Sequence, residues 1–183
     1  MADKPPSDFT EHRLTSTLVY DGRMLKVRED SVRLPDGGTA RREWIQHPGA
    51  VIIIALLDAN TVIMERQFRY PLARHVYELP AGKIEPGEEP LATAQRELIE
   101  ECGYTAKSWR HLATLHPAVG YSDERIELYL ARELTQVGSA LDEGEFLEVV
   151  PMAIDEVRRA IKAGRITDVK VMAGLTWLDS LSD

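Results

Sequence analysis

The chain has 183 residues, of which 44% are apolar and 28% are charged, proportions typical of an ordinary globular protein with one good core. Its formal net charge of −8 argues against non-specific binding to nucleic acid or to an anionic membrane, because both need a basic surface. The longest apolar run, Ala50–Leu57, is far too short to cross a bilayer, so we expect no membrane partner.

The cellular compartment is predicted from two further features. Cys102 is the single cysteine, which excludes an internal disulfide, and its apolar neighbourhood is typical of a small core residue. The N-terminal sequence MADKPPSDF has no apolar stretch of the kind found in secretory signals. We therefore expect a cytoplasmic protein.

Three β-strands are predicted in the first 47 residues, at Ser16–Tyr20, Met24–Leu34 and Thr39–Gln46. The Asp-Gly sequences between them are typical of hairpin turns, so the strands should form an antiparallel sheet. Pro48-Gly49 is the expected boundary. We predict an N-terminal antiparallel β subdomain at residues 1–47 and a second domain at residues 48–183.

The second domain mixes strands and helices. Its first predicted strand is continuously apolar and bounded by Asp-Ala-Asn, a pattern typical of a strand buried on both faces. One helix should begin at Pro90, which needs no backbone N–H in the first turn, and end at Gly103. The other predicted strands are Thr61–Arg69, Val76–Leu79, Trp109–Leu115, Arg125–Glu133 and Leu147–Pro151, and the other predicted helices are Asp155–Ala163 and Asp168–Leu181.

The helix from Pro90 to Gly103 carries an apolar stripe and, beside it, a group of acids. The stripe consists of Leu91, Ala94, Leu98 and Cys102. Glu97, Glu100 and Glu101 span about 100° of the helix circumference, so their carboxylates should converge. Like charges at this spacing oppose helix formation, and a hard divalent cation such as Mg²⁺ would compensate them. The alternative is a solvated surface helix in which Arg96 pairs with Glu100.

The spacing of the fixed residues in this region resembles the Nudix box. Gly82 is followed after five residues by Glu88, and after seven more by the run Arg96-Glu97-Leu98-x-Glu100-Glu101-x-Gly103. Tyr104 stands where the family pattern has an aliphatic residue. The chain is thus similar to the Nudix hydrolases.

That resemblance implies an α/β (α+β) fold, an αβα sandwich on a mixed sheet, and substrates in which a diphosphate is linked to another moiety. It implies that a metal-activated water attacks phosphorus. The implied metal ligands are Glu97 and Glu101, with Glu100 close behind, and the backbone carbonyl of Ala81. Two or three Mg²⁺ ions per site are expected, and Mn²⁺ would fit the same oxygens. Glu88 and Arg96 would pair to hold the loop against the helix.

The resemblance extends to the ADP-ribose pyrophosphatase branch of that family, through an Arg-Arg-Glu strand before His-Pro-Gly-Ala and the sequence Glu-Arg-Gln-Phe-Arg-Tyr before Glu-Leu-Pro-Ala-Gly. In that branch the N-terminal sheet exchanges with a second subunit, which implies a homodimer here. Arg42 and Arg69 would contact the substrate, and Trp44 would stack on adenine. One departure is Val119 before the loop glycine, where that branch often has proline.

The general base is expected in an acidic loop after the box. By resemblance we predict Glu143, with Glu145 as the second candidate, and a solvated acidic loop is the alternative. We predict hydrolysis of ADP-ribose to AMP and ribose 5-phosphate. The alternatives are another nucleotide sugar such as GDP-mannose, a dinucleotide, or a non-catalytic nucleotide sensor, against which the complete glutamate set argues.

Overall fold

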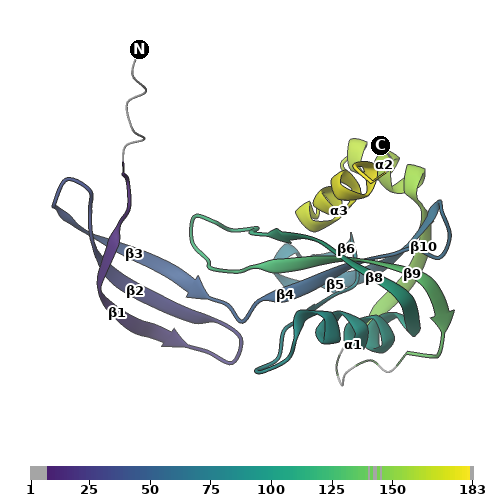
Figure 1. Cartoon of the computed structure of the whole chain (residues 1–183), viewed down its shortest axis with the longest axis horizontal. Helices are drawn as coiled ribbons and strands as arrows, with labels where there is room; N and C mark the ends of the chain where they lie inside the picture. Colours follow the sequence, from purple (N-terminus) through teal and green to yellow (C-terminus); the bar gives the residue numbers. More distant parts are fainter. Residues whose placement is uncertain (1–7, 140, 142–143, 145, 182–183) are drawn as a thin grey trace, which may run out of the picture. The chain divides into compact units, whose positions relative to one another are not determined.

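The computed structural model describes residues 8–139, 141, 144 and 146–181 (Figure 1). The chain forms two units, Met1–His47 with Ala118–Glu124 and Pro48–Pro117 with Arg125–Asp183. Within the described ranges, no helix is long and apolar enough to span a bilayer.

The first unit is a three-stranded antiparallel sheet in the order β1 (His12–Asp21), β2 (Lys26–Arg33) and β3 (Thr39–Gln46). Hairpin turns join neighbouring strands, as the Asp-Gly sequences predict, and the predicted N-terminal antiparallel sheet is confirmed. The segment Ala118–Glu124 adds to the sheet at the end of β3. There the N–H of Ile45 donates to the carbonyl of Tyr121 at 2.8 Å.

The second unit contains two sheets. One has the antiparallel order β10-β5-β6, and the other has the order β7-β4-β9-β8, in which only the β4–β9 pair is parallel. The strands are β4 (Ala50–Ala55), β5 (Thr61–Arg69), β6 (Arg74–Glu78), β7 (Ala81–Lys83), β8 (Tyr104–Leu115), β9 (Ile126–Gln136) and β10 (Leu147–Ala153). The helices are α1 (Pro90–Cys102), α2 (Ile154–Lys162) and α3 (Val169–Asp179), with a 3₁₀ turn at Tyr70–Leu72.

Strand β4 lies between two apolar clusters, which confirms the prediction of a strand buried on both faces. Ile52 and Ile54 pack in the cluster that includes residues of α2 and α3. Val51 and Ile53 pack in the cluster that includes residues of α1. Figure 1 shows α1 on one face of the sheets and the two C-terminal helices on the other. The predicted αβα sandwich with a mixed sheet is therefore confirmed.

Helix α1 begins and ends where the sequence predicts. Pro90 occupies its first turn, and Gly103 closes it with a φ of 74° and an N–H that donates to the carbonyls of Ile99 and Leu98. The predicted stripe is partly wrong, because Leu91 is 39% exposed whereas Ala94, Leu98 and Cys102 are buried. Thr93 is fully buried in the first turns, so the apolar face of α1 does not include Leu91.

Candidate active site

The close approach of α1 to β7 occurs at Gly82. A Cβ atom added to Gly82 would lie 1.8 Å from Oε1 of Glu97 and 1.9 Å from its Cδ. Contacts this short do not occur between real atoms, so the Glu97 side chain takes the space that any other residue at position 82 would need. The requirement for glycine here is steric, and it places the Glu97 carboxylate against the β7 backbone.

Glu101 lies against the same strand. Its side chain is buried, at 6% exposure, and Oε2 accepts a hydrogen bond of 3.1 Å from the backbone N–H of Ala81. Burial of a carboxylate is costly unless it is hydrogen-bonded, and a backbone donor supplies part of that compensation. The structure thus brings Ala81, Glu97 and Glu101, three of the four predicted metal ligands, to one stretch of β7 and α1.

Arg96 ties the loop to the helix. Its Nε and Nη2 donate to the two carboxylate oxygens of Glu88 at 3.0 and 3.1 Å, which confirms the predicted pair. Hydrogen bonds from Arg96 lower the pKa of Glu88 to about 2, and the same bonds raise the pKa of Arg96. Arg96 Nη1 also contacts Oε1 of Glu97 at 3.0 Å and Oε2 of Glu100 at 2.8 Å. The alternative Arg96–Glu100 pair is therefore present as well.

The donor set fits a hard divalent cation. It consists of three carboxylates and a backbone carbonyl, which are oxygen ligands of the kind that Mg²⁺ prefers, and Gly82 keeps Cβ atoms out of the approach. Among the residues that the structure describes, no three His, Cys, Asp or Glu side chains converge as a ready-made metal cluster. Glu97 and Glu100 are turned toward Arg96 instead, so metal binding would require these two side chains to change partners.

Arg69 is the last residue of β5. Its Nε and Nη2 donate to Oε1 and Oε2 of Glu78 at 2.6 and 2.9 Å. These hydrogen bonds raise the pKa of Arg69, and the negative charges of Glu78, Glu101 and Glu65 raise it further. The influence of Glu101 places the Arg69 guanidinium within electrostatic reach of the acidic face of α1.

Two further predicted site residues belong to the first unit. Arg42 and Trp44 lie on β3 of the first unit, where Arg42 Nε donates to Oε2 of Glu11 at 2.9 Å and the half-buried Trp44 lies opposite Arg28. The hydrogen bonds with Glu11 raise the pKa of Arg42. Glu143 and Glu145 lie outside the described residues.

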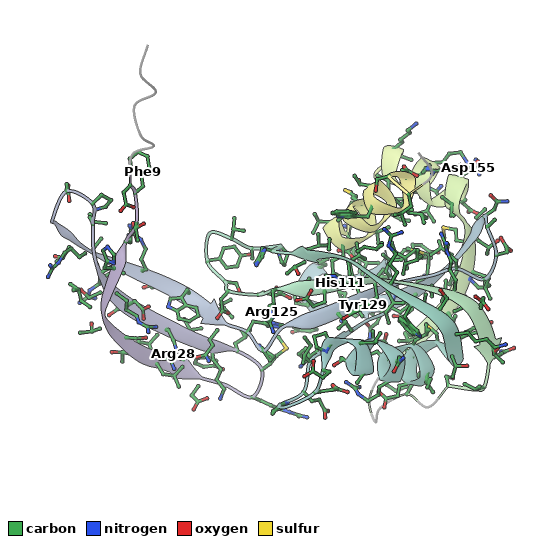
Figure 2. All side chains as sticks on the ribbon, in the orientation of Figure 1. Phe9, Arg28, His111, Arg125, Tyr129 and Asp155 are labelled. Carbon is green, nitrogen blue, oxygen red and sulfur yellow. The ribbon has the colours of Figure 1, made fainter. Side chains whose placement is uncertain are left out.

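Sequence reasoning missed a polar cluster on the α1 face of the sheet. Oε2 of Glu127 contacts Nε2 of His111 at 2.8 Å and accepts a hydrogen bond from Thr114 Oγ1 at 2.7 Å. The ring of His111 lies beside that of Tyr129, with 5.3 Å between the ring centroids (Figure 2). Burial raises the pKa of Glu127, but these hydrogen bonds and the charges of His111 and Arg125 lower it below the ordinary value. One feature of the sequence could have indicated this cluster. Glu127 is two residues from Tyr129, so the two side chains lie on the same face of the strand, and a carboxylate beside a core residue needs polar partners.

The register extends this cluster toward the box. Gly82 pairs with Val51, Val51 pairs with Glu127, and Glu127 pairs with Thr114, so these four residues form one row across the sheet. Burial raises the pKa of Tyr129, and so do the charges of Glu127 and of Glu89 at the start of α1. The row therefore runs from the β7–α1 contact across β4 to β9 and β8.

A recess of about 760 Å³ lies elsewhere, after the end of β4 and beside the start of α2. It contains none of the predicted site residues. Its lining carries both signs of charge, and Arg158 there is paired with Asp155 and Asp179. The recess therefore favours no class of ligand, and the predicted metal ligands Ala81, Glu97 and Glu101 lie in the β7–α1 region instead.

Comparison with known proteins identifies the family. Residues 46–175 match the NUDIX domain family. This chain belongs to the Nudix family. The N-terminal strands of this Nudix protein, at residues 11–45, match the nucleoside diphosphate sugar hydrolase N-terminal domain.

Two relatives of this Nudix protein match nearly its whole length. It is 40% identical to the methanol dehydrogenase activator of Bacillus methanolicus, over 93% of both chains. It is 36% identical to the ADP-ribose pyrophosphatase of Bacillus subtilis, over 92% of both chains. A solved structure described as an ADP compounds hydrolase superimposes with a TM-score of 0.84 over 93% of both chains. At 21% sequence identity, that likeness concerns the fold alone.

Proposed function

We propose that this Nudix protein hydrolyses ADP-ribose to AMP and ribose 5-phosphate. The observation that carries the proposal is the arrangement of Glu97 over Gly82 and of Glu101 on the Ala81 N–H, which builds the acidic platform of the box. The similarity to an ADP-ribose pyrophosphatase along the whole chain supports this choice of substrate.

The reaction breaks one P–O bond of the diphosphate. A water oxygen attacks phosphorus, the bridging oxygen leaves with the other phosphate, and the water proton passes to Glu143 or, as the second candidate, to Glu145. Arg69 binds phosphate oxygens through its guanidinium, since this group matches phosphate geometry. Glu97, Glu100, Glu101 and the Ala81 carbonyl would hold two or three Mg²⁺ ions. When bound, Mg²⁺ neutralises the diphosphate and lowers the pKa of bound water, and Mn²⁺ would serve the same oxygens.

A homodimer completes the proposal. Strand β1 is exposed along its whole length, and its apolar side chains Leu14, Leu18, Val19 and Tyr20 are among those left in solvent. Exposed apolar groups of this extent mark surfaces that another protein covers. A second copy of this chain is the partner, and Arg42 and Trp44 then contribute to substrate binding. The protein acts in the cytoplasm.

A panel of diphosphate substrates tests the function. With Mg²⁺ present, we expect AMP and ribose 5-phosphate from ADP-ribose, and slower turnover of GDP-mannose, a dinucleotide and a nucleoside triphosphate. Product identity is scored by chromatography. If GDP-mannose or the dinucleotide is turned over faster, the proposal of ADP-ribose as the substrate is wrong. Binding of ADP-ribose without release of AMP would identify a nucleotide sensor instead.

Variants of α1 separate the metal platform from the rest of the helix. We expect Glu97→Gln and Glu101→Gln to lower kcat by roughly 100-fold or more while the protein stays folded. Glu89→Gln is the matched control, because Glu89 precedes the same helix and its side chain makes no capping hydrogen bond. Unchanged kinetics in Glu97→Gln and Glu101→Gln would contradict the assignment of the metal ligands.

A further inference from the structure

A buried carboxylate lies between two cations from different elements. Glu78, at the end of β6, is 5% exposed and accepts both hydrogen bonds of Arg69 from β5. Lys170, from the first turn of α3, lies 3.4 Å from Oε2 of Glu78, and its Nζ also contacts Asp168 at 3.0 Å. The acid is thus an anchor in the interior, and the side chain of Arg69 is 45% exposed.

The position of Glu78 is costly for the sheet. Glu78 lies directly opposite Glu65 in the β5–β6 register, and Glu65 is buried as well, at 4% exposure. Like charges opposite each other destabilise a sheet, and each buried carboxylate loses its hydration. A leucine would fill this space without those costs. These costs indicate that the role of Glu78 lies in the position that it gives to the Arg69 side chain.

Glu78 occupies only one edge of the Arg69 guanidinium. Five N–H groups are available, and Glu78 takes the Nε–H and one Nη2–H. No other hydrogen bond of Arg69 exists within the described part of the chain, so the second edge, formed by Nη1 and the other Nη2–H, makes no hydrogen bond there. That edge is a complete two-pronged donor of the kind that binds a phosphate.

We propose that Glu78, supported by Lys170, is a positioning residue that fixes the free edge of Arg69 toward a phosphate of the diphosphate substrate. This inference rests on the proposed function, because it requires Arg69 to bind substrate. A free arginine side chain has many rotamers, and immobilising it before the ligand arrives removes that entropy cost from binding. Lys170, at 3.4 Å from Oε2 of Glu78, adds a second positive charge that helps to keep this buried carboxylate ionised.

Kinetics of Glu78→Gln test the proposal. This variant keeps the shape of the side chain but donates where Glu78 accepts, so one of the two bonds to Arg69 is lost. We expect KM for ADP-ribose to rise roughly tenfold with little change in kcat, since a phosphate contact made equally in the ground and transition states affects KM. The matched control is Glu148→Gln. It changes the ion-pair partner of Arg66, which lies on β5 like Arg69, and it should leave KM unchanged.

A double-mutant cycle separates positioning from a merely structural role. If Glu78 acts through Arg69, then Glu78→Gln in an Arg69→Ala background raises KM no further. If the two increases in KM multiply, Glu78 acts independently of Arg69 and the proposal is wrong. Glu78→Asp covers the case in which the glutamine variant fails to fold. It keeps the charge but is too short to hold both bonds, so KM should rise less, and an unchanged KM would contradict the proposal.

The wild-type protein and Arg69→Ala distinguish this inference from the proposed function. A wild-type protein that hydrolyses no substrate of the panel contradicts both. If the wild-type protein hydrolyses ADP-ribose while Arg69→Ala leaves KM and kcat unaltered, the inference and the phosphate-binding role of Arg69 are wrong, but the proposed hydrolysis of ADP-ribose stands.

Discussion

The carboxylate of Glu97 takes the place that a side chain on Gly82 would fill, with 1.8 Å between Oε1 and the position of the missing Cβ. Gly82 has no positive φ, so its role is to leave room and not to adopt an unusual backbone conformation. The distance also means that any change at position 82 acts first on Glu97. The β7 backbone at Gly82 and the Glu97 side chain of α1 therefore depend on each other for their positions.

Gly82→Ala tests this relationship. The added methyl group would push the Glu97 side chain away from β7, which is possible at moderate cost because the end of a glutamate is flexible. We expect a loss of about 1 kcal/mol in the free energy of unfolding but a fall in kcat of roughly 100-fold, since small misplacements at a reacting centre are costly. Urea denaturation and steady-state kinetics measure the two effects. A variant with normal kcat would show that Glu97 can serve from another position.

The Glu88–Arg96 pair predicts how stability depends on pH. The pKa of Glu88 falls from 4.5 to about 2 in the folded protein, because Arg96 donates to both of its oxygens. As pH falls, the unfolded chain therefore takes up the proton first. The stabilisation by this pair is fully present above about pH 4.5 and is lost as pH falls toward about 2.

The variant Glu88→Gln tests the direction of this pH dependence. In metal-free protein, we expect the variant to be less stable than the wild type by about 1 kcal/mol near neutral pH, because the pair is partly exposed. The difference should shrink as the pH is lowered through the acidic range. Urea denaturation at several pH values measures it, and a difference that grows toward low pH would contradict the assignment.

Local sequence signals predict an element well where residues such as proline and glycine mark both of its ends, or where a continuous apolar run requires burial. Pro90 and Gly103 bound α1, and the apolar residues of β4 require burial on both sides. The three-residue strand β7 was missed, because Ala-Gly-Lys has little β propensity and pairs only through its backbone with β4. Strand β8 begins at Tyr104, earlier than predicted, because residues 104–108 show no clean alternation and are recruited by pairing with β9.

The site was predictable where spacing along one helix defines it, and not where distant segments meet. Glu97 and Glu101 follow from the box, but the burial of Glu101 depends on the N–H of Ala81. The contact between Glu78 and Lys170 joins residues 92 positions apart, and no pattern in either segment signals it. Arg69 was predicted as a phosphate ligand, but the carboxylate that orients it was not.

The general base remains a prediction from the sequence, because Glu143 and Glu145 lie outside the described residues. We expect Glu143→Gln to lower kcat by roughly 100- to 10,000-fold with little change in KM, as for loss of a proton acceptor. Glu145→Gln serves as the comparison, two residues away in the same acidic loop. If Glu145→Gln is the damaging change, the base is Glu145.

The exposed apolar residues of β1 predict the oligomeric state. Leu18 is 39% exposed and Tyr20 is 58% exposed, and among the described residues every position of β1 is exposed. A second copy would bury these side chains, so we expect the 20.6 kDa chain to sediment as a dimer at micromolar concentration.

The variant Leu18→Glu should shift the protein toward monomer, because an unpaired charge opposes burial. Leu57→Glu, at a 37% exposed leucine of the second unit, is the control and should leave the dimer intact. Wild-type protein that sediments as a monomer would contradict the dimer, and with it the contribution of Arg42 and Trp44 from a second copy.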